Sequence, residues 1–320
     1  MTVTAPTGIP TGAPASRTGR ATPPAASVAQ PRAWVGWLFI APNLVGVALF
    51  TLVPLVSVVL LSFTEWNLVS GFGGIEFVGL ENFVNVFRDP GFWNSVVLTL
   101  VYAGVSVPLT TILGLALGLA LNRDIPGRAA LRAIFFVPYI VSVVAIGMTW
   151  LMLMNPSSGL VNQVLGALGL QDAPAWFASS YWALPALIVI AVWGGVGYAA
   201  LIYLSALQDA PTQLYEAADL DGAGVWTKFR VITWPSLVPT TVFLLVTLFI
   251  GASQGFGLIA LITAGGPGDA TTTLPYYMYQ TGFQFYRFGY ASAIGMVTFL
   301  GVLALTLLTW RAQRGRALHD

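Results

Sequence analysis

Long runs of apolar residues dominate the chain, and short polar segments separate them. A helix needs roughly 20 mainly apolar residues to cross the hydrocarbon core of a bilayer. Six stretches meet this requirement, at about residues 34–63, 94–121, 131–154, 181–207, 236–262 and 288–310. Lipid offers no partner to unpaired backbone groups, so each stretch is predicted to be a helix. The pattern therefore predicts an all-α polytopic membrane protein with six transmembrane helices.

The polar segments divide the chain into four parts. Residues 1–33 are rich in Pro, Ala, Thr and Gly and lack the apolar core of a signal peptide, which predicts a disordered cytoplasmic tail. The first transmembrane helix and an outer loop follow at 34–93. The other five helices form a core at 94–311, and residues 312–320 form a second cytoplasmic tail.

Positive charge is distributed unevenly between the connecting segments. If the N-terminus is inside, 11 of the 13 Lys and Arg residues lie in inner segments, and only Arg88 and Arg287 lie in outer loops. Cytoplasmic loops of membrane proteins carry an excess of Lys and Arg. Both termini are therefore predicted to be cytoplasmic, in agreement with an even number of spans.

The first outer loop contains a pattern of its own. Leu80, Phe83, Val84 and Phe87 follow the i, i+3, i+4, i+7 spacing of an amphipathic helix. Such a helix would lie on the outer face of the membrane or pack as a buried element.

Two glycine pairs have the spacing that lets helices approach closely. Gly114 with Gly118 and Gly251 with Gly255 each form a GxxxG pattern. Both pairs are predicted to mark helix packing rather than substrate contacts.

Composition agrees with a membrane protein and narrows its chemistry. Only 8% of residues are charged, against about 25% in soluble domains. The chain has no Cys, and its single histidine is His319. Thiolate or histidine catalysis, His- or Cys-ligated metal sites and a bound cofactor are therefore not expected. A net charge of +1 gives no indication of nucleic-acid binding.

The predicted spans contain essentially no ionisable residue, with Arg132 at an edge. Proton- and ion-coupled carriers need such groups at membrane depth. Transport driven by protons or ions is therefore not expected, and the energy must come from elsewhere, although a passive facilitator would also tolerate charge-free spans. An intramembrane enzyme would lack a nucleophile and a carboxylate pair.

A substrate path through these spans would have no charged groups, but it would have aromatic, hydroxyl and amide groups. The candidates on the spans are Tyr139, Ser142, Trp193, Tyr198, Ser253, Gln254 and Phe256. Aromatic faces with a few hydrogen-bonding groups suit an uncharged polyol, whose C–H faces are apolar. This combination favours a sugar.

The cytoplasmic segment 209–234 has a clear internal design. Pro211 suits the first turn of a helix that runs through residues 214–218 and stops at Asp221 and Gly222. Val225, Phe229 and Ile232 indicate a second short helix before Pro235 opens the next span. The segment has a net charge of −2, unlike ordinary inner loops, and this charge together with exposed apolar residues favours a protein partner.

The sequence YEAADLDGA at 215–223, continuing to Pro239, resembles the EAA loop of binding-protein-dependent ABC importers. In that family the loop docks on the ATP-binding subunit. Segments 78–83, 89–93, 262–268 and 283–293 are similar to the sugar-type permeases of that family. The resemblance covers roughly residues 34–311.

The resemblance implies a type I ABC importer permease fold in a bacterial inner membrane, with residues 94–311 as the permease core. It also implies that this chain has no enzymatic activity. The implied partners are a second homologous permease, two ATP-binding subunits and an extracytoplasmic solute-binding protein, and the chain would lie in the lipid bilayer. The coupling contacts would be Glu216, Ala217, Ala218, Asp221 and Gly222. The substrate-path candidates are Tyr139, Gly195, Tyr198, Ser253, Gln254 and Phe256. A sugar or oligosaccharide is the expected substrate, with glycerol phosphate or a related polyol as the alternative.

Overall fold

The computed structural model describes residues 33–314 except positions 125 and 171, so the two predicted tails lie almost entirely outside the described residues. The chain divides into two compact units, Met1–Leu52 and Val53–Asp320. The first contains α1 (Ala33–Val47) and a π-helical turn, η1 (Ala48–Leu52). None of its described side chains is buried, and Phe50 is 83% exposed. An apolar helix exposed on all sides requires lipid or another protein around it.

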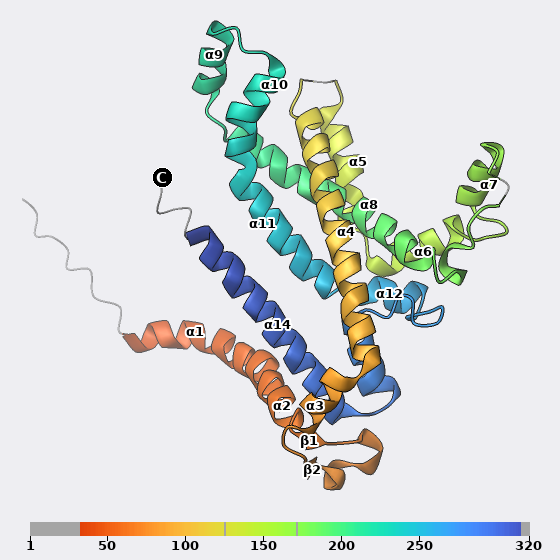
Figure 1. Ribbon diagram of the computed structural model, residues 1–320. Helices are drawn as coiled ribbons and strands as arrows, with labels where there is room; N and C mark the ends of the chain where they lie inside the picture. The colour runs from red at the N-terminus through yellow and green to blue at the C-terminus, as the bar shows by residue number, and fades with distance from the viewer. Residues whose placement is uncertain (1–32, 125, 171, 315–320) are drawn as a thin grey trace, which may run out of the picture. The chain divides into compact units, whose positions relative to one another are not determined.

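The second unit contains all the other elements (Figure 1). Its long helices are α2 (Val53–Leu61), α4 (Pro90–Leu121), α5 (Arg128–Ile140), α6 (Val143–Leu153), α8 (Ala183–Gln208), α11 (Trp234–Ser253) and α14 (Phe288–Arg314). Its short elements are β1 (Thr64–Glu65), η2 (Leu68–Ser70), η3 (Phe72–Gly74), β2 (Glu76–Phe77), α3 (Glu81–Arg88), α7 (Leu160–Ala167), η4 (Trp176–Ala178), α9 (Thr212–Leu220), α10 (Val225–Lys228), η5 (Phe229–Thr233), α12 (Gly257–Ile262), α13 (Leu274–Tyr279) and η6 (Gln280–Gln284). The all-α prediction is confirmed.

Among the described residues, four helical stretches are long and apolar enough to cross a membrane, namely Trp37–Leu61, Pro90–Leu121, Ala183–Gln208 and Val225–Ile262. The pair α5 and α6 makes a fifth if it is counted as one span, and α14 has a shorter apolar part at Phe288–Ala304. The six predicted spans are compatible with this arrangement.

The third predicted span, 131–154, is not one helix. Its two halves, α5 and α6, are bent by 99° at residues 141 and 142. Val141 has an extended backbone (ψ 142°), and the Ser142 hydroxyl accepts a hydrogen bond from the Val144 N–H at 3.3 Å. Ser142 thus acts as an N-cap that starts a new helix. The prediction of a continuous helix here is wrong, because apolar composition does not show where a helix restarts.

The packing of α4 against α8 forms the centre of the second unit, with α11 beside both helices (Figure 1). A Cβ on Gly114 would lie 2.5 Å from the Cβ of Ala199, and one on Gly118 would lie 3.1 Å from the carbonyl oxygen of Ala200. The packing role predicted for this glycine pair is confirmed. For the second pair, no described atom outside the neighbouring backbone lies within 4 Å of the Cβ position of Gly251, whereas a Cβ on Gly255 would lie 3.7 Å from a ring carbon of Tyr102.

The loop that the sequence predicts to lie outside contains a two-stranded sheet and the short helix α3. Strands β1 and β2 pair antiparallel, and Thr64 lies opposite Phe77. Asn82 on α3 is buried and donates from Nδ2 to the carbonyl oxygens of Ser62 at 3.1 Å and Thr64 at 2.8 Å.

The predicted amphipathic helix is confirmed as α3, and most of its apolar stripe is exposed. Leu80, which precedes the helix, is exposed, as are Val84 and Phe87, whereas Val86 on the opposite side is fully buried. This arrangement favours the membrane-surface alternative over a buried packing helix.

Asp89 joins the start of α4 to two later elements. Its Oδ1 accepts a hydrogen bond from the Gly91 N–H at 2.8 Å, and its Oδ2 accepts from the hydroxyls of Tyr290, at 2.8 Å, and Tyr277. Burial opposes ionisation of this carboxyl group, but these hydrogen bonds outweigh burial, so the pKa of Asp89 lies below its ordinary value. The carboxylate therefore ties α4, α13 and α14 together.

Candidate functional site

The elbow, residues 209–234, which the sequence predicts to be cytoplasmic, begins with α9. Pro211 is its N-cap residue, and its carbonyl oxygen accepts from the Leu214 N–H at 3.2 Å. At the other end, the Gly222 N–H donates to the Asp219 carbonyl at 3.1 Å and the Ala223 N–H to the Ala218 carbonyl at 2.9 Å. This pair of bonds is a Schellman motif, which needs a left-handed residue at Gly222 (φ +70°). The predicted helix stop is confirmed.

The second helix of the elbow does not end before the next span. Helix α10 passes through the π-helical turn η5 directly into α11, with Pro235 in the first turn of α11 (Figure 1). The predicted separation at Pro235 is therefore wrong. A widened π turn accommodates a proline that lacks a backbone N–H. Helix α10, η5 and α11 are consequently continuous along the chain.

Two side-chain interactions fasten α9 to this axis. Lys228 forms an ion pair with Asp219, and the hydroxyls of Tyr215 and Thr233 are hydrogen-bonded at 2.9 Å. Thr233 is buried, so its hydrogen bond is shielded from water. The elbow can therefore move as one piece with the start of α11.

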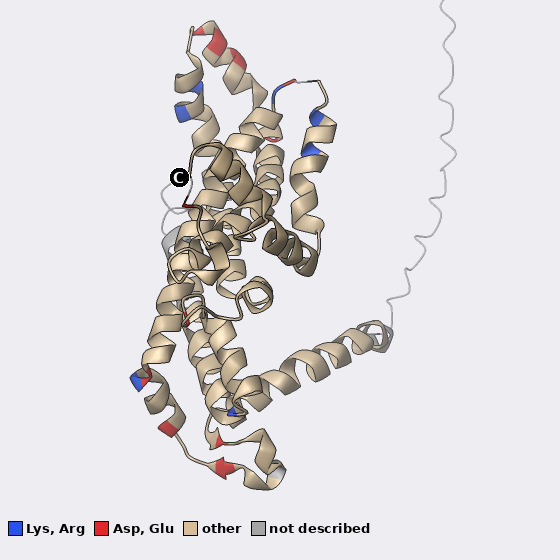
Figure 2. Cartoon of the chain, turned by 90° about the vertical axis from the view of Figure 1, so that its right-hand side faces the viewer, with Lys and Arg blue, Asp and Glu red and all other residues tan. Residues whose placement is uncertain are grey.

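The predicted coupling residues lie on the surface of the elbow. Glu216, Ala217, Asp221 and Gly222 are exposed, and Ala218 is partly buried. Large apolar side chains surround them: Leu220 is 90%, Val225 81% and Trp226 72% exposed. The acidic residues of α9 are coloured red on the cartoon, at one end of the second unit (Figure 2). An exposed surface that combines apolar and acidic residues is typical of a protein interface.

Three of the six substrate-path candidates meet in one cavity of about 340 Å³. Tyr139 comes from the last turn of α5, and Gly195 and Tyr198 come from α8. The rings of Tyr139 and Tyr198 are stacked, with centroids 4.6 Å apart and planes at 16°. Within the described residues neither hydroxyl has a hydrogen-bond partner, so both are available to a ligand.

Small residues on α8 set the geometry of this cavity. A Cβ on Gly197 would overlap the carbonyl oxygen of Phe135, so the backbones of α5 and α8 touch one turn before Tyr139. A Cβ on Gly195 would lie 3.0 Å from Cγ2 of Thr110 on α4. These glycines let three helices converge around the tyrosine pair.

Residues of α4 and α11 that were not predicted from the sequence also line this cavity. Tyr102, Ser106 and Thr110 line it from α4, and Thr247 and Gly251 line it from α11. The α4 residues belong to a polar row at helical spacing on an otherwise apolar span, which runs through Ser95, Thr99, Tyr102, Ser106 and Thr110. This row of polar residues in the sequence could have predicted that α4 forms one side of the cavity.

The other three candidates do not join this cavity. Ser253, Gln254 and Phe256 line a separate cavity of about 580 Å³ at the end of α11. The structure therefore splits the predicted path residues into two groups.

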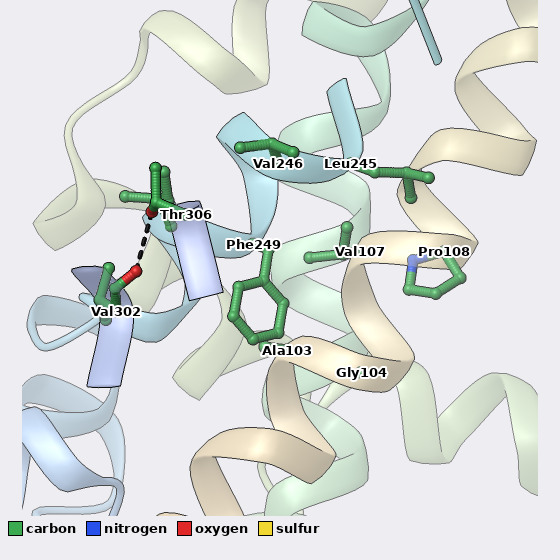
Figure 3. A pocket seen from close by; sticks show the side chains of 10 residues that line it. Ala103, Gly104, Val107, Pro108, Leu245, Val246, Phe249, Val302 and Thr306 are labelled. Carbon is green, nitrogen blue, oxygen red and sulfur yellow. Dashed lines mark hydrogen bonds between the residues drawn. The ribbon is translucent and has the colours of Figure 1, made fainter. Parts of the chain in front are cut away.

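A third cavity, of about 300 Å³ between α4, α11 and α14, is apolar (Figure 3). Ala103, Val107 and Phe249 line it, and its one hydroxyl, that of Thr306, donates to the Val302 carbonyl at 2.8 Å. An apolar wall of this kind offers few hydrogen-bonding groups that could recognise a polyol.

Among the described residues, no group of three or more His, Asp or Glu residues could hold a metal ion.

Residues 110–316 match the family described as the inner-membrane component of binding-protein-dependent transport systems, and the chain belongs to this family. It is thus a multi-pass inner-membrane transport component rather than an enzyme.

The chain is 36% identical over 268 residues to a probable ABC transporter permease protein of Sinorhizobium fredii, covering 83% of this chain and 86% of the relative. It is 35% identical to the trehalose/maltose transport system permease protein of Thermococcus litoralis, covering 88% and 94%. A chain of a bacterial ABC transporter that imports the acidic polysaccharide alginate superposes with a TM-score of 0.78 at 26% identity, covering 88% of this chain and 95% of that one. A chain of a bacterial alginate ABC transporter in complex with an alginate pentasaccharide-bound periplasmic protein superposes with a TM-score of 0.76 at 26% identity, covering 86% of this chain and 92% of that one. The predicted permease fold is confirmed.

Proposed function

We propose that this chain is a permease subunit of an ATP-driven importer for a sugar or oligosaccharide. The observation that carries the proposal is the continuous helical axis from the exposed elbow through α10, η5 and α11 to the cavity of Tyr139 and Tyr198. The named substrates of the trehalose/maltose and alginate relatives support the sugar class.

The elbow would dock on a separate ATP-binding subunit. Glu216, Ala217, Ala218, Asp221 and Gly222 are the proposed contacts, with Leu220 and Trp226 as apolar anchors beside them. Closure of two such subunits on ATP would pull α11 and switch the cavity between outward and inward access. The importer would also contain a second permease and a binding protein, as the alginate complex includes a periplasmic protein.

We propose that the elbow, both termini and the tails 1–33 and 312–320 lie on the cytoplasmic side. Residues 34–93 would form the first helix with its outer loop, and 94–311 the permease core. The excess of Lys and Arg in the same segments supports this orientation.

The cavity favours a neutral sugar over a phosphorylated polyol. None of its lining residues is charged, and its polar groups are hydroxyls. A phosphate group would enter such a site without a cation to pair with it. Glycerol phosphate remains the second candidate only through the family resemblance.

Uptake by proteoliposomes tests the function. The complete importer and this chain alone are compared with radiolabelled maltose, trehalose, lactose and maltotriose, with and without ATP. We expect ATP-dependent uptake of at least one sugar by the complete importer only. Flux through the chain alone would indicate a facilitator, and no uptake of any sugar would contradict the substrate class.

Substitutions in the cavity test the path. Tyr198→Ala should reduce the rate of sugar uptake about 10-fold or more if a stacking contact of roughly 1.5 kcal/mol is lost. Tyr181→Ala is the matched control, because Tyr181 is 77% exposed in the outer loop before α8. Equal rates of uptake by the two variants would show that Tyr198 is not part of the substrate path.

Substitutions of Gly222 test the coupling role. Asn tolerates the left-handed conformation, whereas Val does not. If only the helix stop matters, Gly222→Asn should retain ATPase assembly and Gly222→Val should lose it. If the ATPase approaches the backbone closely, both should lose it. Normal uptake and assembly by Gly222→Val would refute the assignment.

A further inference from the structure

The cavity at the end of α11 has a different character from the Tyr139–Tyr198 cavity. It has a volume of about 580 Å³, and its walls come from α2, α11, α13, η6 and α14. Its aromatic and polar lining consists chiefly of Ser253, Gln254, Phe256, Tyr279, Phe283 and Phe288. Tyr279 and Phe283 are 36% and 60% exposed.

The aromatic residues of this cavity form a continuous row. Ring centroids are 4.9 Å apart from Phe256 to Tyr279, 5.4 Å from Tyr279 to Phe283, and 5.3 Å from Phe283 to Phe288. A further 5.3 Å leads from Phe288 to Trp66 in the outer loop. Each step is an ordinary packing distance for a pair of aromatic rings.

The outer end of the row opens on a polar cavity of about 250 Å³. Trp66 lines this cavity together with Asn67, Asn85 and Glu81. The aromatic row therefore runs from a polar outer pocket to the end of α11.

The backbone at the inner end of the row is not helical. Residues 254–256 interrupt the apolar stretch between α11 and α12, and Gln254 is exposed. Irregular backbone at membrane depth is tolerated where protein buries it or where it lines a water-filled cavity. An exposed amide at this interruption indicates water rather than lipid in the cavity.

The two cavities adjoin along the last turn of α11. Ala252 lines the Tyr139–Tyr198 cavity, and the next residue, Ser253, lines the aromatic one. Phe256 and Ala252 pack on one core cluster that contains Tyr102 and Tyr276. These side chains form the partition between the cavities.

We infer that the aromatic cavity is an outer saccharide subsite, occupied before sugar reaches Tyr139 and Tyr198. The C–H faces of the sugar would contact Tyr279, Phe283 and Phe288, and its hydroxyls would bond to Gln254 and Ser253. The row offers several aromatic faces and edges beside these polar groups. This inference rests on the proposed transport function.

Cysteine labelling gives a direct test, because the chain has no cysteine of its own. Phe283→Cys is compared with Phe285→Cys, since both residues are similarly exposed, at 60% and 56%, and Phe285 does not line the cavity. The complete importer in proteoliposomes is treated from outside with a membrane-impermeant maleimide. The probe ligand is whichever of the four sugars above is taken up.

Phe283→Cys should react from outside, and sugar at about ten times its Kd should slow the reaction about 10-fold. Phe285→Cys should react at the same rate with and without sugar. Equal rates for Phe283→Cys with and without a transported sugar would overturn the subsite. Reaction only with a membrane-permeant reagent, or with none, would overturn it in favour of lipid or a partner protein.

A second cysteine variant and the uptake by the unsubstituted importer distinguish failure of the subsite from failure of the proposed function. If Phe283→Cys does not assemble, Gln254→Cys replaces it with the same expected protection. If the unsubstituted importer takes up none of the sugars, the proposed function fails. If uptake is normal and protection is absent, only the outer subsite fails.

Discussion

Gly197 lies where α8 and α5 touch backbone to backbone. A Cβ at this position would overlap the carbonyl oxygen of Phe135 and lie 3.0 Å from the Cα of Phe136. Both obstacles are backbone atoms, so no side-chain rotation can relieve them. Gly197→Ala must therefore push α5 away from α8. Gly194, on the same helix, has no atom within 4 Å of its Cβ position and gives the matched control, Gly194→Ala.

The size of the effect follows from two opposing contributions. Overpacking of a tight contact costs about 1–3 kcal/mol, whereas replacing Gly by Ala inside a helix gains up to about 1 kcal/mol. Gly194→Ala should thus be neutral or slightly stabilising, and Gly197→Ala should be destabilising. Because Tyr139 follows Phe135 by one turn, the same shift should also separate its ring from Tyr198.

Thermal unfolding of both purified variants in detergent, followed by fluorescence, measures the first effect. Sugar uptake by the assembled importer measures the second. Gly197→Ala should have the lower unfolding temperature and the lower uptake rate. A Gly197→Ala protein as stable as Gly194→Ala would refute the backbone contact between α5 and α8.

Three further predictions concern stability and docking. Asp89→Asn removes a carboxylate whose pKa lies below its ordinary 3.8. The ionised carboxylate stabilises the folded chain at neutral pH. This contribution to stability is lost as the pH falls through the pKa that Asp89 has in the folded chain. The unfolding temperatures of the two proteins should therefore differ at pH 7 and converge below about pH 4, and a difference that does not change with pH would contradict this role. Asn82→Ala should lower the free energy of unfolding by about 1–3 kcal/mol, because two carbonyl groups lose their donor; an unchanged denaturation midpoint would count against it. Trp226→Ala should leave the unfolding temperature almost unchanged, because the side chain is 72% exposed, yet weaken co-purification of the ATPase subunits; the reverse pattern would show a structural role.

Local chemistry explains why the elbow and the spans were predictable. The start of α9 at Pro211 and its stop at Gly222 depend on the conformations that these two residues prefer, and the structure has both. Long apolar stretches have no alternative to helix in lipid, so their positions were predictable as well. The charged residues of the second unit lie on loops, on short helices and near the ends of the long helices, as their sequence positions indicated (Figure 2).

The tertiary structure decided which faces of these helices meet. An apolar helix has no polar face to orient it, so sequence spacing could not show that Tyr139 stacks on Tyr198 or that Ser253 belongs to another cavity. It also could not show the bend at Val141, because the cap at Ser142 is one hydroxyl in an apolar run. The sequence alone determined that the chain spans a membrane and has an acidic two-helix segment between two spans. The positions of its cavities depend on contacts between helices that are far apart along the chain, such as α4 with α8 and α11 around Tyr198, and α2 with α14 near Ser253.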